Sequence, residues 1–436
     1  MSVDLTIEKL IYGGDGLARL PSGDRAKSVF VPYSLPGERV RANLVEDKKS
    51  YARAEVERIL EPSAQRDTPQ CKYFGTCGGC QYQHASYEAQ LASKRNILIE
   101  SLHRTAAIEL PVQLTVHASP QPYGYRNRTR VHVEHTPTYA LGYYKAGSRQ
   151  LVAIDACPIS SPLLNRVIRT LGASRVLPPA VREIEIFADD QDRQVLLELY
   201  VGAQRPSDEE FRRFLDFASS ELPECFGVHV FAESNLQARI PTLQQTASAG
   251  ASYLNYRVGN CIYRTSAGSF FQVNRFMVEP LMSLVTDNLS GHRALDLYAG
   301  VGLFSLPLAD SFDEFVAVEA SPFAFTDLDH QLPPRARRYC QTTENFLTHR
   351  GEEALACDVA IIDPPRAGIG PLSAKLLTSL LPKEIRYVSC DPVTLARDLK
   401  VLLESGYRIR EAHLLDMFPQ TMHIESFVRL TSSRHE

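Results

Sequence analysis

The feature that most constrains the fold is an alternation of apolar runs and helical stretches from about residue 256 onward. Four of these runs have the character of buried strands, over residues 292–298, 315–319, 358–363 and 387–390. Continuous apolar strands separated by helical stretches are typical of a parallel sheet with helices on both faces. We therefore predict a doubly wound α/β domain over residues 256–436.

A glycine-containing turn follows the first of these strands. Gly300 and Gly302 would let a ligand approach the backbone where the strand passes into a helix. Glu319 ends the next strand, 23 residues after Asp296, where a carboxylate can accept hydrogen bonds from both ribose hydroxyls. Ser305 stands where a dinucleotide-binding fold usually has a third glycine, so the turn favours S-adenosylmethionine. The alternative is an ordinary strand–helix turn whose glycines serve packing.

A cysteine ends a later strand of the same segment. Cys390 and Asp363 both follow buried runs, and the carboxyl ends of parallel strands share the edge where ligands bind. We therefore predict that both line the cofactor cleft, although a lone cysteine is more often an inert buried residue.

A thiolate in such a cleft can add to C6 of a uracil and so make C5 able to attack a sulfonium methyl group. A base must then remove the C5 proton, and Glu425 is the candidate. The alternative for Glu425 is a surface charge at a strand end.

Four further cysteines have the pattern of a metal site. Cys71, Cys77 and Cys80 fall within ten residues, and Cys157, which is followed by a proline, could supply a fourth ligand. Four thiolates suit either zinc or an iron–sulfur cluster, and the spacing hardly separates the two. The remaining cysteines are scattered and are interpreted as packing residues: Cys225, Cys261, Cys340 and Cys357.

Two more segments precede the α/β part. Residues 1–64 show short strands and glycine turns typical of a small oligonucleotide-binding barrel. Residues 65–255 contain the cysteine loop, a helix predicted from Tyr87 to Arg104, and a β-rich stretch. The expected class is α/β plus β, with domains over residues 1–64, 65–255 and 256–436.

The signals for RNA binding are weaker. A net charge of −4 counts mildly against a nucleic-acid binder, although a local basic groove remains compatible with it. Arg126, Arg128 and Arg130 alternate, so a strand would place all three on one face, as a phosphate backbone requires. Phe270 beside Gln272 could stack on and read a flipped base. Ordinary solvated strands also carry such arginine rows, and a phenylalanine pair is usually part of a core.

Targeting signals are missing from the sequence. It contains no apolar run of about 18 residues that would predict a membrane helix. Its first residues lack the basic and apolar regions of a signal peptide. These features predict a cytoplasmic protein, and nothing implies an obligatory protein partner.

In this order the motifs resemble the bacterial RNA uridine-5-methyltransferase family over essentially the whole chain. The N-terminal segment is similar to that family's TRAM domain, including residues 35–38. The cysteines at 71, 77, 80 and 157 resemble its [4Fe–4S] site, so the resemblance favours the cluster over zinc. It also implies a Rossmann-like class I methyltransferase domain, S-adenosylmethionine as cofactor and RNA as substrate.

The resemblance assigns roles to residues as well. It implies Cys390 as nucleophile and Glu425 as base, and it places four residues against the cofactor: Gln272, Tyr298, Glu319 and Asp363. Asn345 would approach the adenine. Leu303 and Asp391 depart from the family pattern, because some members have asparagine at each position.

The predicted function is methylation of C5 of a specific uridine in 23S rRNA, because a cluster and a TRAM domain together favour the ribosomal branch. One alternative is uridine-5 methylation in the T-loop of tRNA. Another is a non-catalytic RNA-binding or assembly factor, against which the presence of both Cys390 and Glu425 argues.

Overall fold

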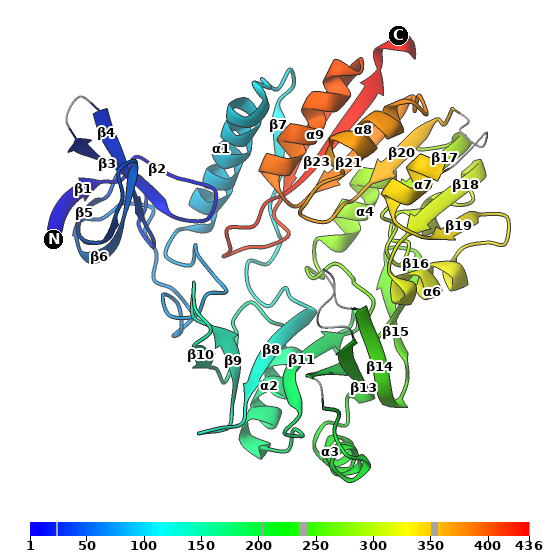
Figure 1. Cartoon of the computed structure of the whole chain (residues 1–436), viewed down its shortest axis with the longest axis horizontal. Helices are drawn as coiled ribbons and strands as arrows, with labels where there is room; N and C mark the ends of the chain where they lie inside the picture. The colour runs from blue at the N-terminus through cyan, green and yellow to red at the C-terminus, as the bar shows by residue number, and fades with distance from the viewer. Residues whose placement is uncertain (23–24, 203, 235–241, 350–355, 436) are drawn as a thin grey trace.

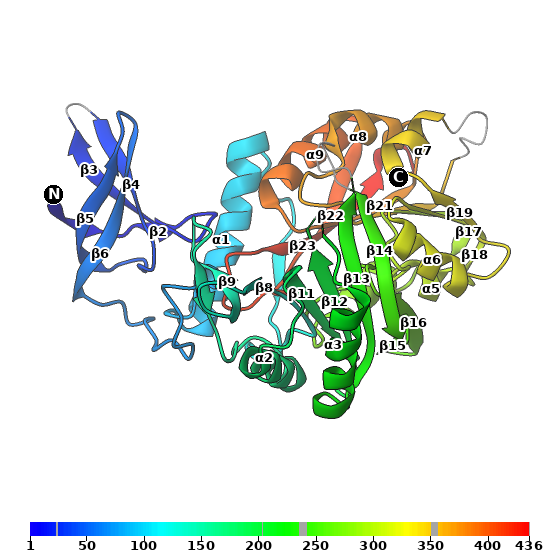
Figure 2. The same ribbon diagram turned by 60° about the horizontal axis from the view of Figure 1, so that its bottom comes forward.

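The computed structural model describes residues 1–22, 25–202, 204–234, 242–349 and 356–435, and it contains three large sheets (Figure 1). The N-terminal sheet has six strands in the order β1-β5-β6-β4-β3-β2. Its strands are β1 (Ser2–Thr6), β2 (Lys9–Leu10), β3 (Gly16–Ser22), β4 (Arg25–Val31), β5 (Arg39–Asp47) and β6 (Tyr51–Glu61). Alternate residues of these strands, such as Val40 and Ala42, form a small apolar core of their own. The turn between β2 and β3 reaches out to the side of the long helix α1 (Figures 1 and 2).

The central sheet has seven strands in the order β10-β9-β8-β11-β12-β13-β14. They are β8 (Arg128–Glu134), β9 (Ala140–Tyr144), β10 (Leu151–Ala153), β11 (Val181–Ala188), β12 (Val195–Val201), β13 (Cys225–Ser234) and β14 (Thr242–Gly250). The helices α2 (Pro162–Ser174) and α3 (Asp208–Glu221) belong to this part of the chain and begin at the serine caps Ser161 and Ser207. Buried side chains of the sheet and of α2 share one apolar core.

The C-terminal sheet has eight strands in the order β19-β18-β17-β20-β21-β23-β22-β7. They are β7 (Leu114–His117), β17 (Gly291–Leu297), β18 (Phe312–Glu319), β19 (Arg337–Cys340), β20 (Val359–Ile362), β21 (Glu384–Ser389), β22 (Tyr407–Leu415) and β23 (Glu425–Ser432). The strands from β19 to β21 are parallel, and β23 runs antiparallel between β21 and β22. A 3-10 turn, Ser433–His435, follows β23.

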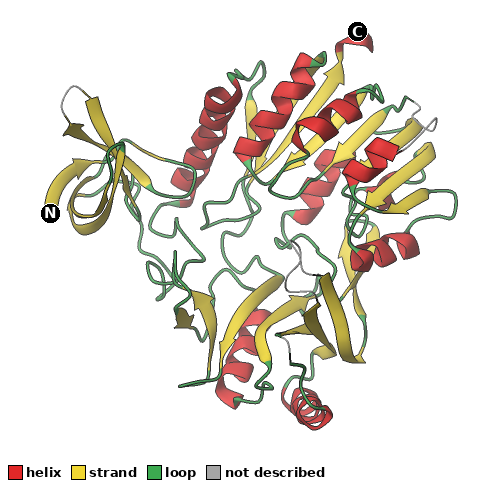
Figure 3. Cartoon of the chain, viewed as in Figure 1, coloured by secondary structure: helices red, strands yellow, loops and turns green. Residues whose placement is uncertain are grey.

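Helices cover both faces of this sheet (Figure 3). They are α1 (Tyr87–Ala106), α4 (Val278–Thr286), α5 (Ser305–Leu308), α6 (Pro322–Gln331), α7 (Thr343–His349), α8 (Gly370–Thr378) and α9 (Pro392–Glu404). In β20, Ala360 and Ile362 pack with α1, α8 and α9, whereas Val359 and Ile361 pack with α4, α6 and the hairpin of β15 (Tyr253–Val258) and β16 (Cys261–Ser266). This alternation confirms the predicted doubly wound sheet, whose strands are apolar on both faces.

The sheet also contains a strand that the predicted boundaries place elsewhere. β7 and α1 lie within residues 65–255, yet β7 pairs in parallel with β22 and α1 packs against α9. A four-residue edge strand has too short a pattern to reveal a partner almost 300 residues away. No helix in the described part of the chain is long and apolar enough to cross a membrane.

Candidate active site

A cavity of about 1010 Å³ opens at the carboxyl edge of the parallel strands. It lies where the strand order reverses between β17 and β20, the switch point at which open α/β sheets bind ligands. The structure brings six residues predicted to act on cofactor or substrate to its wall: Gln272, Tyr298, Glu319, Asp363, Cys390 and Glu425.

The turn after β17 forms the cofactor end of the cavity. Gly300 and Gly302 adopt positive φ angles of 57° and 93°, and so does Tyr298 at 67°. The Gly300 amide donates to Glu319 Oε2 over 2.8 Å, and the Ser321 amide donates to Oε1 over 2.6 Å. These two bonds fix the carboxylate at the end of β18 beside a backbone that a ligand can approach.

Two buried acids lie behind this turn and beside it. Burial raises the pKa of Asp296 to about 7, although the Ser305 hydroxyl donates to it. Burial and then the nearby Asp296 raise the pKa of Asp363 to about 7 as well. The Gln272 side-chain amide donates to Asp363 Oδ2 over 3.5 Å, which joins the segment before α4 to the end of β20. An acidic end of this kind suits a cationic ligand.

The thiol and the candidate base face each other across two strands. Ser389 is opposite Ser426 in the antiparallel pairing of β21 with β23, so the next positions in register are Cys390 and Glu425. The Ser426 hydroxyl donates to the Ser389 carbonyl over 3.1 Å and ties the two strand ends together. Sheet pairing therefore brings the two groups to one point of the cavity.

This pairing has electrostatic consequences. Burial, followed by the charges of Glu425 and Asp363, raises the pKa of the Cys390 thiol to about 12, while Arg366 acts in the opposite direction. Burial and Asp363 raise the pKa of the Glu425 carboxyl well above its ordinary value. Burial and the neighbouring acids thus favour the uncharged forms of both groups. Burial and Arg366 lower the pKa of the neighbouring His423 to about 4, so its imidazole is neutral.

The segment before α4 contributes an aromatic ring to the mouth of the cavity. Phe270 and Phe271 both line the cavity, but Phe270 is 63% exposed whereas Phe271 is 2% exposed and packs in the core. Asn274 is fully buried, and its amide donates to the Met417 carbonyl over 3.1 Å. Of this stretch, Phe270 and Gln272 are available to a ligand, while Phe271 and Asn274 are structural.

The expected row of three phosphate-binding arginines is wrong in part. Arg128 is 7% exposed, donates to the Ser269 carbonyl and lies 3.1 Å from Glu185. Arg130 is half-exposed but is engaged with Glu185 over 2.6 Å. Only Arg126 of the three lines the catalytic cavity. The alternation of the arginines correctly predicted that their side chains share one face. It could not show that acidic side chains of β11 lie on the same face and pair with them.

The four predicted metal-ligating cysteines lie in one locality. Burial raises the pKa of Cys71, Cys77 and Cys80, in the last case to about 12, and Cys157 raises each of them further. The Gly79 amide donates to Cys77 Sγ over 3.4 Å. Within the described ranges, no three histidine, cysteine or acidic side chains are close enough to hold a single metal ion.

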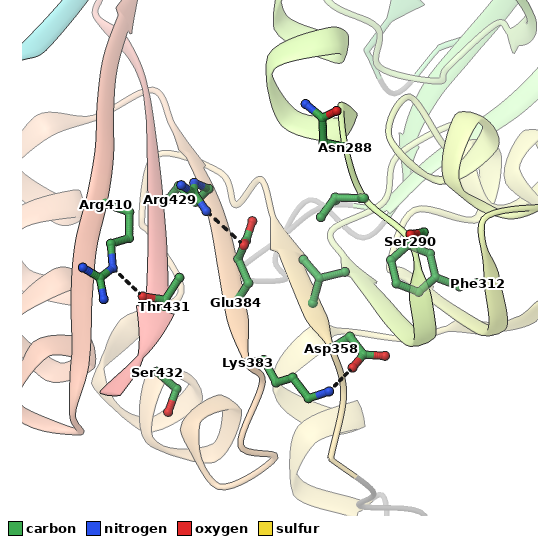
Figure 4. A pocket seen from close by; sticks show the side chains of 12 residues that line it. Asn288, Ser290, Phe312, Asp358, Lys383, Glu384, Arg410, Arg429, Thr431 and Ser432 are labelled. Atoms are coloured by element: carbon green, nitrogen blue, oxygen red, sulfur yellow. Dashed lines mark hydrogen bonds and ion pairs between the residues drawn. The ribbon is translucent and has the colours of Figure 1, made fainter. Parts of the chain in front are cut away.

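A second cavity, of about 450 Å³, lies at the opposite, amino end of the parallel strands (Figure 4). Its polar side chains are engaged with one another: Lys383 with Asp358, Arg429 with Glu384, and Arg410 with Thr431. None of the predicted site residues lines it. We therefore place the candidate active site in the larger cavity.

Part of the cavity wall was not predicted from the sequence. Thr342, Thr343 and Glu344 line the cavity after β19, whereas Asn345 is exposed on α7 outside the lining. The rule that ligands bind beyond the carboxyl ends of strands would have indicated these residues, had the short strand β19 been recognised. Leu303 lines the cavity with an apolar side chain.

Comparisons with known proteins agree with this geometry. The family described as tRNA (Uracil-5-)-methyltransferase matches residues 86–327 and 346–433, and the TRAM domain matches residues 2–56. An RNA methyltransferase of Aquifex aeolicus is 33% identical over 98% of this chain and 97% of its own. The 23S rRNA (uracil(1939)-C(5))-methyltransferase RlmD of Halomonas elongata is 34% identical over 98% of this chain and 89% of its own.

One solved structure shares the whole architecture. The Pyrococcus abyssi tRNA (uracil-54, C5)-methyltransferase, in complex with S-adenosyl-L-homocysteine, superposes with a TM-score of 0.74. The match covers 99% of this chain and all of the other at 23% identity. At that identity the likeness shows the fold.

Proposed function

The chain belongs to the tRNA (uracil-5-)-methyltransferase family, and on that premise we propose that it methylates C5 of a specific uridine in 23S rRNA. It is an RNA methyltransferase with an N-terminal TRAM domain. The observation that carries the proposal is the register that sets Cys390 opposite Glu425 in the cavity. The Halomonas elongata relative is named for 23S rRNA, and the similarity spans nearly all of this chain.

Cys390 is the proposed nucleophile. Its sulfur forms a bond to C6 of the uracil, and the electron pair of the C5–C6 double bond becomes available at C5. S-adenosylmethionine, when bound, supplies the methyl group and leaves as S-adenosylhomocysteine. Glu425 then takes the C5 proton, and the returning electron pair expels the Cys390 thiolate.

The cofactor end of the site is suited to a sulfonium. Asp363 and Gln272 would lie beside it, and Glu319 would accept hydrogen bonds from the ribose hydroxyls. Tyr298 forms the wall after β17. Burial and then the neighbouring acids raise the pKa values of Cys390 and Glu425, and a bound cation would act in the opposite direction and favour their reactive, ionised forms.

We also propose that the cysteines at 71, 77, 80 and 157 hold a [4Fe–4S] cluster. Their thiols lie near enough to influence one another electrostatically, and four thiolates are the usual ligands of such a cluster. The resemblance of the sequence motif favours the cluster over zinc. Iron bound there would hold the four sulfurs as thiolates.

Two variants test the mechanism. In Glu425→Gln, addition and methyl transfer can proceed but proton removal cannot, so a denaturation-resistant protein–RNA adduct should accumulate. In Cys390→Ala, neither the adduct nor methylated RNA should form. Cys225→Ala, which alters a cysteine of the central sheet, is the matched control and should behave as the unaltered protein. Normal turnover by Glu425→Gln would remove Glu425 from the role of base.

The substrate needs a separate test. Mapping 5-methyluridine in total rRNA and tRNA, with and without the protein, should show one 23S rRNA site that depends on it. If methylation of the tRNA T-loop depended on the protein instead, the alternative function of tRNA uridine-5 methylation would be favoured. The Pyrococcus abyssi structure is named as an enzyme of that kind, a tRNA (uracil-54, C5)-methyltransferase. If removing the protein left 5-methyluridine unchanged in both rRNA and tRNA, the protein would be a non-catalytic RNA-binding factor instead.

A further inference from the structure

The turn between β2 and β3 carries the N-terminal domain to the side of α1 (Figures 1 and 2). Its base is held on α1 by Lys9, which lies 2.6 Å from Glu100, and by Leu10 in the core that α1 shares with the C-terminal sheet. Gly13 and Gly14 adopt positive φ angles of 109° and 95°, which allow the turn to close.

This turn is packed tightly against the cysteine loop and also contacts the segment that leads to Glu425. A Cβ atom added at Gly14 would lie 2.9 Å from Gln81 Cβ and 3.5 Å from Met422 Cβ. The turn therefore occupies a fixed position beside the cysteine loop and β23.

At the tip of the turn, Tyr12 contacts the residue that follows the nucleophile. The Tyr12 hydroxyl donates to Asp391 Oδ2 over 2.7 Å. The other carboxylate oxygen, Oδ1, accepts from the amides of Val393 and Thr394 over 3.0 and 2.9 Å and so caps α9. Burial and Asp391 raise the pKa of Tyr12, so the hydroxyl remains a donor.

The peptide that carries Cys390 is thus fixed on both sides. On one side, Ser389 is paired with Ser426 in the sheet. On the other, Asp391 is held by the helix amides and by Tyr12. Freeing the Asp391 side chain would loosen the second attachment, and the sulfur must reach C6 of the base within a fraction of an ångström.

We propose that Tyr12 is a positioning residue for the nucleophile, through which the N-terminal domain sets the orientation of the loop at 390–391. The inference rests on the proposed role of Cys390. It makes the TRAM domain part of the catalytic centre as well as an RNA-binding unit. The departure at Asp391 fits this role, because a carboxylate oxygen is a stronger acceptor for the Tyr12 hydroxyl than an amide oxygen is.

Tyr12→Phe tests the proposal because it removes one oxygen and keeps the packed ring. At saturating RNA and S-adenosylmethionine, methyl transfer should slow about tenfold while both KM values stay unchanged. Adduct formation in a Glu425→Gln background should slow by the same factor. Tyr51→Phe, in the same domain, removes a hydroxyl that donates to Glu46 Oε1 over a long 3.4 Å, and it should leave both rates unchanged.

A double variant separates positioning from general damage. If Tyr12 acts through Asp391, adding Tyr12→Phe to Asp391→Ala should slow transfer no further than Asp391→Ala alone. Unchanged kcat in Tyr12→Phe would overturn the proposal. So would a raised KM for RNA with unchanged kcat, which would make Tyr12 an RNA contact instead. Failure of the unaltered protein to methylate any RNA would contradict the proposed function and not this contact.

Discussion

Acidic residues at the cofactor end of the cavity show how position alters chemistry at the scale of single residues. Asp296 and Asp363 have pKa values near 7 because burial penalises their charged forms. The motif predicted that Asp363 would lie in the cleft, but its pKa depends on how completely the surrounding strands exclude water. A sulfonium beside these two carboxyl groups would favour their charged forms, because opposite charges attract.

The raised pKa of Asp363 makes cofactor binding dependent on pH. Because the pKa of Asp363 is about 7, protonation removes its negative charge as the pH falls through that value. The Kd for S-adenosylmethionine should therefore rise about tenfold between about pH 8 and about pH 6, as calorimetry can measure. S-adenosylhomocysteine, which lacks the positive sulfur, is the control and should weaken much less. An equal rise in Kd for both ligands would show that the charge of Asp363 does not contribute to binding of the sulfonium.

The residues of the candidate site were largely predictable, and their pairing was not. Strand-end positions identified Asp363 and Cys390, because the edge rule needs only the strands. Glu425 was identified by chemistry and resemblance, yet its place opposite Cys390 follows from an antiparallel register that no local pattern reveals. Arg128 was misjudged for the same reason, since its partner Glu185 lies on another strand.

At the scale of elements, the segment between β22 and β23 depends on contacts from far along the chain. Gln420 exchanges hydrogen bonds with Gln90 of α1, and its carbonyl accepts from the amide of Gln81 in the cysteine loop over 3.1 Å. The helix itself was predicted from Tyr87 to Arg104 and observed to Ala106. Its role in holding this segment was not predictable, because the two are more than 300 residues apart.

A buried ion pair anchors the start of the same segment. Lys94 Nζ lies 2.6 Å from Asp416 Oδ1, and both side chains are fully buried. Lys94→Met should lower the free energy of unfolding by about 3–5 kcal/mol, because it leaves the Asp416 carboxylate buried without its partner. Urea unfolding would measure the loss.

The matched control is the double variant Lys94→Met with Asp416→Leu, which removes both charges. It should recover most of the stability, since a well-packed apolar pair replaces buried ions at little net cost. Equal losses in the single and double variants would mean that packing at this point, and not the unpaired charge, limits stability.

At the scale of the whole molecule, the three predicted segments are joined more closely than their boundaries suggest. The N-terminal sheet has its own core, yet Leu10 packs into the core beneath α1. α1 and β7 precede the central sheet in the chain but complete the C-terminal one. The alternating pattern after residue 256 predicted the doubly wound sheet, but non-local pairing decided where that sheet ends.

This arrangement predicts the behaviour of fragments. Residues 256–436 alone would expose the face of α9 that Ile97, Leu98 and Leu102 of α1 cover, and β22 would become an unpaired edge. Such a fragment should bind a hydrophobic dye and show no cooperative thermal transition. A fragment of residues 84–436, which keeps α1 and β7, should unfold cooperatively. The shorter fragment could instead unfold as cooperatively as the longer one. Residue 256 would then mark the start of an autonomous domain, and α1 and β7 would be additions to a sheet that is stable without them.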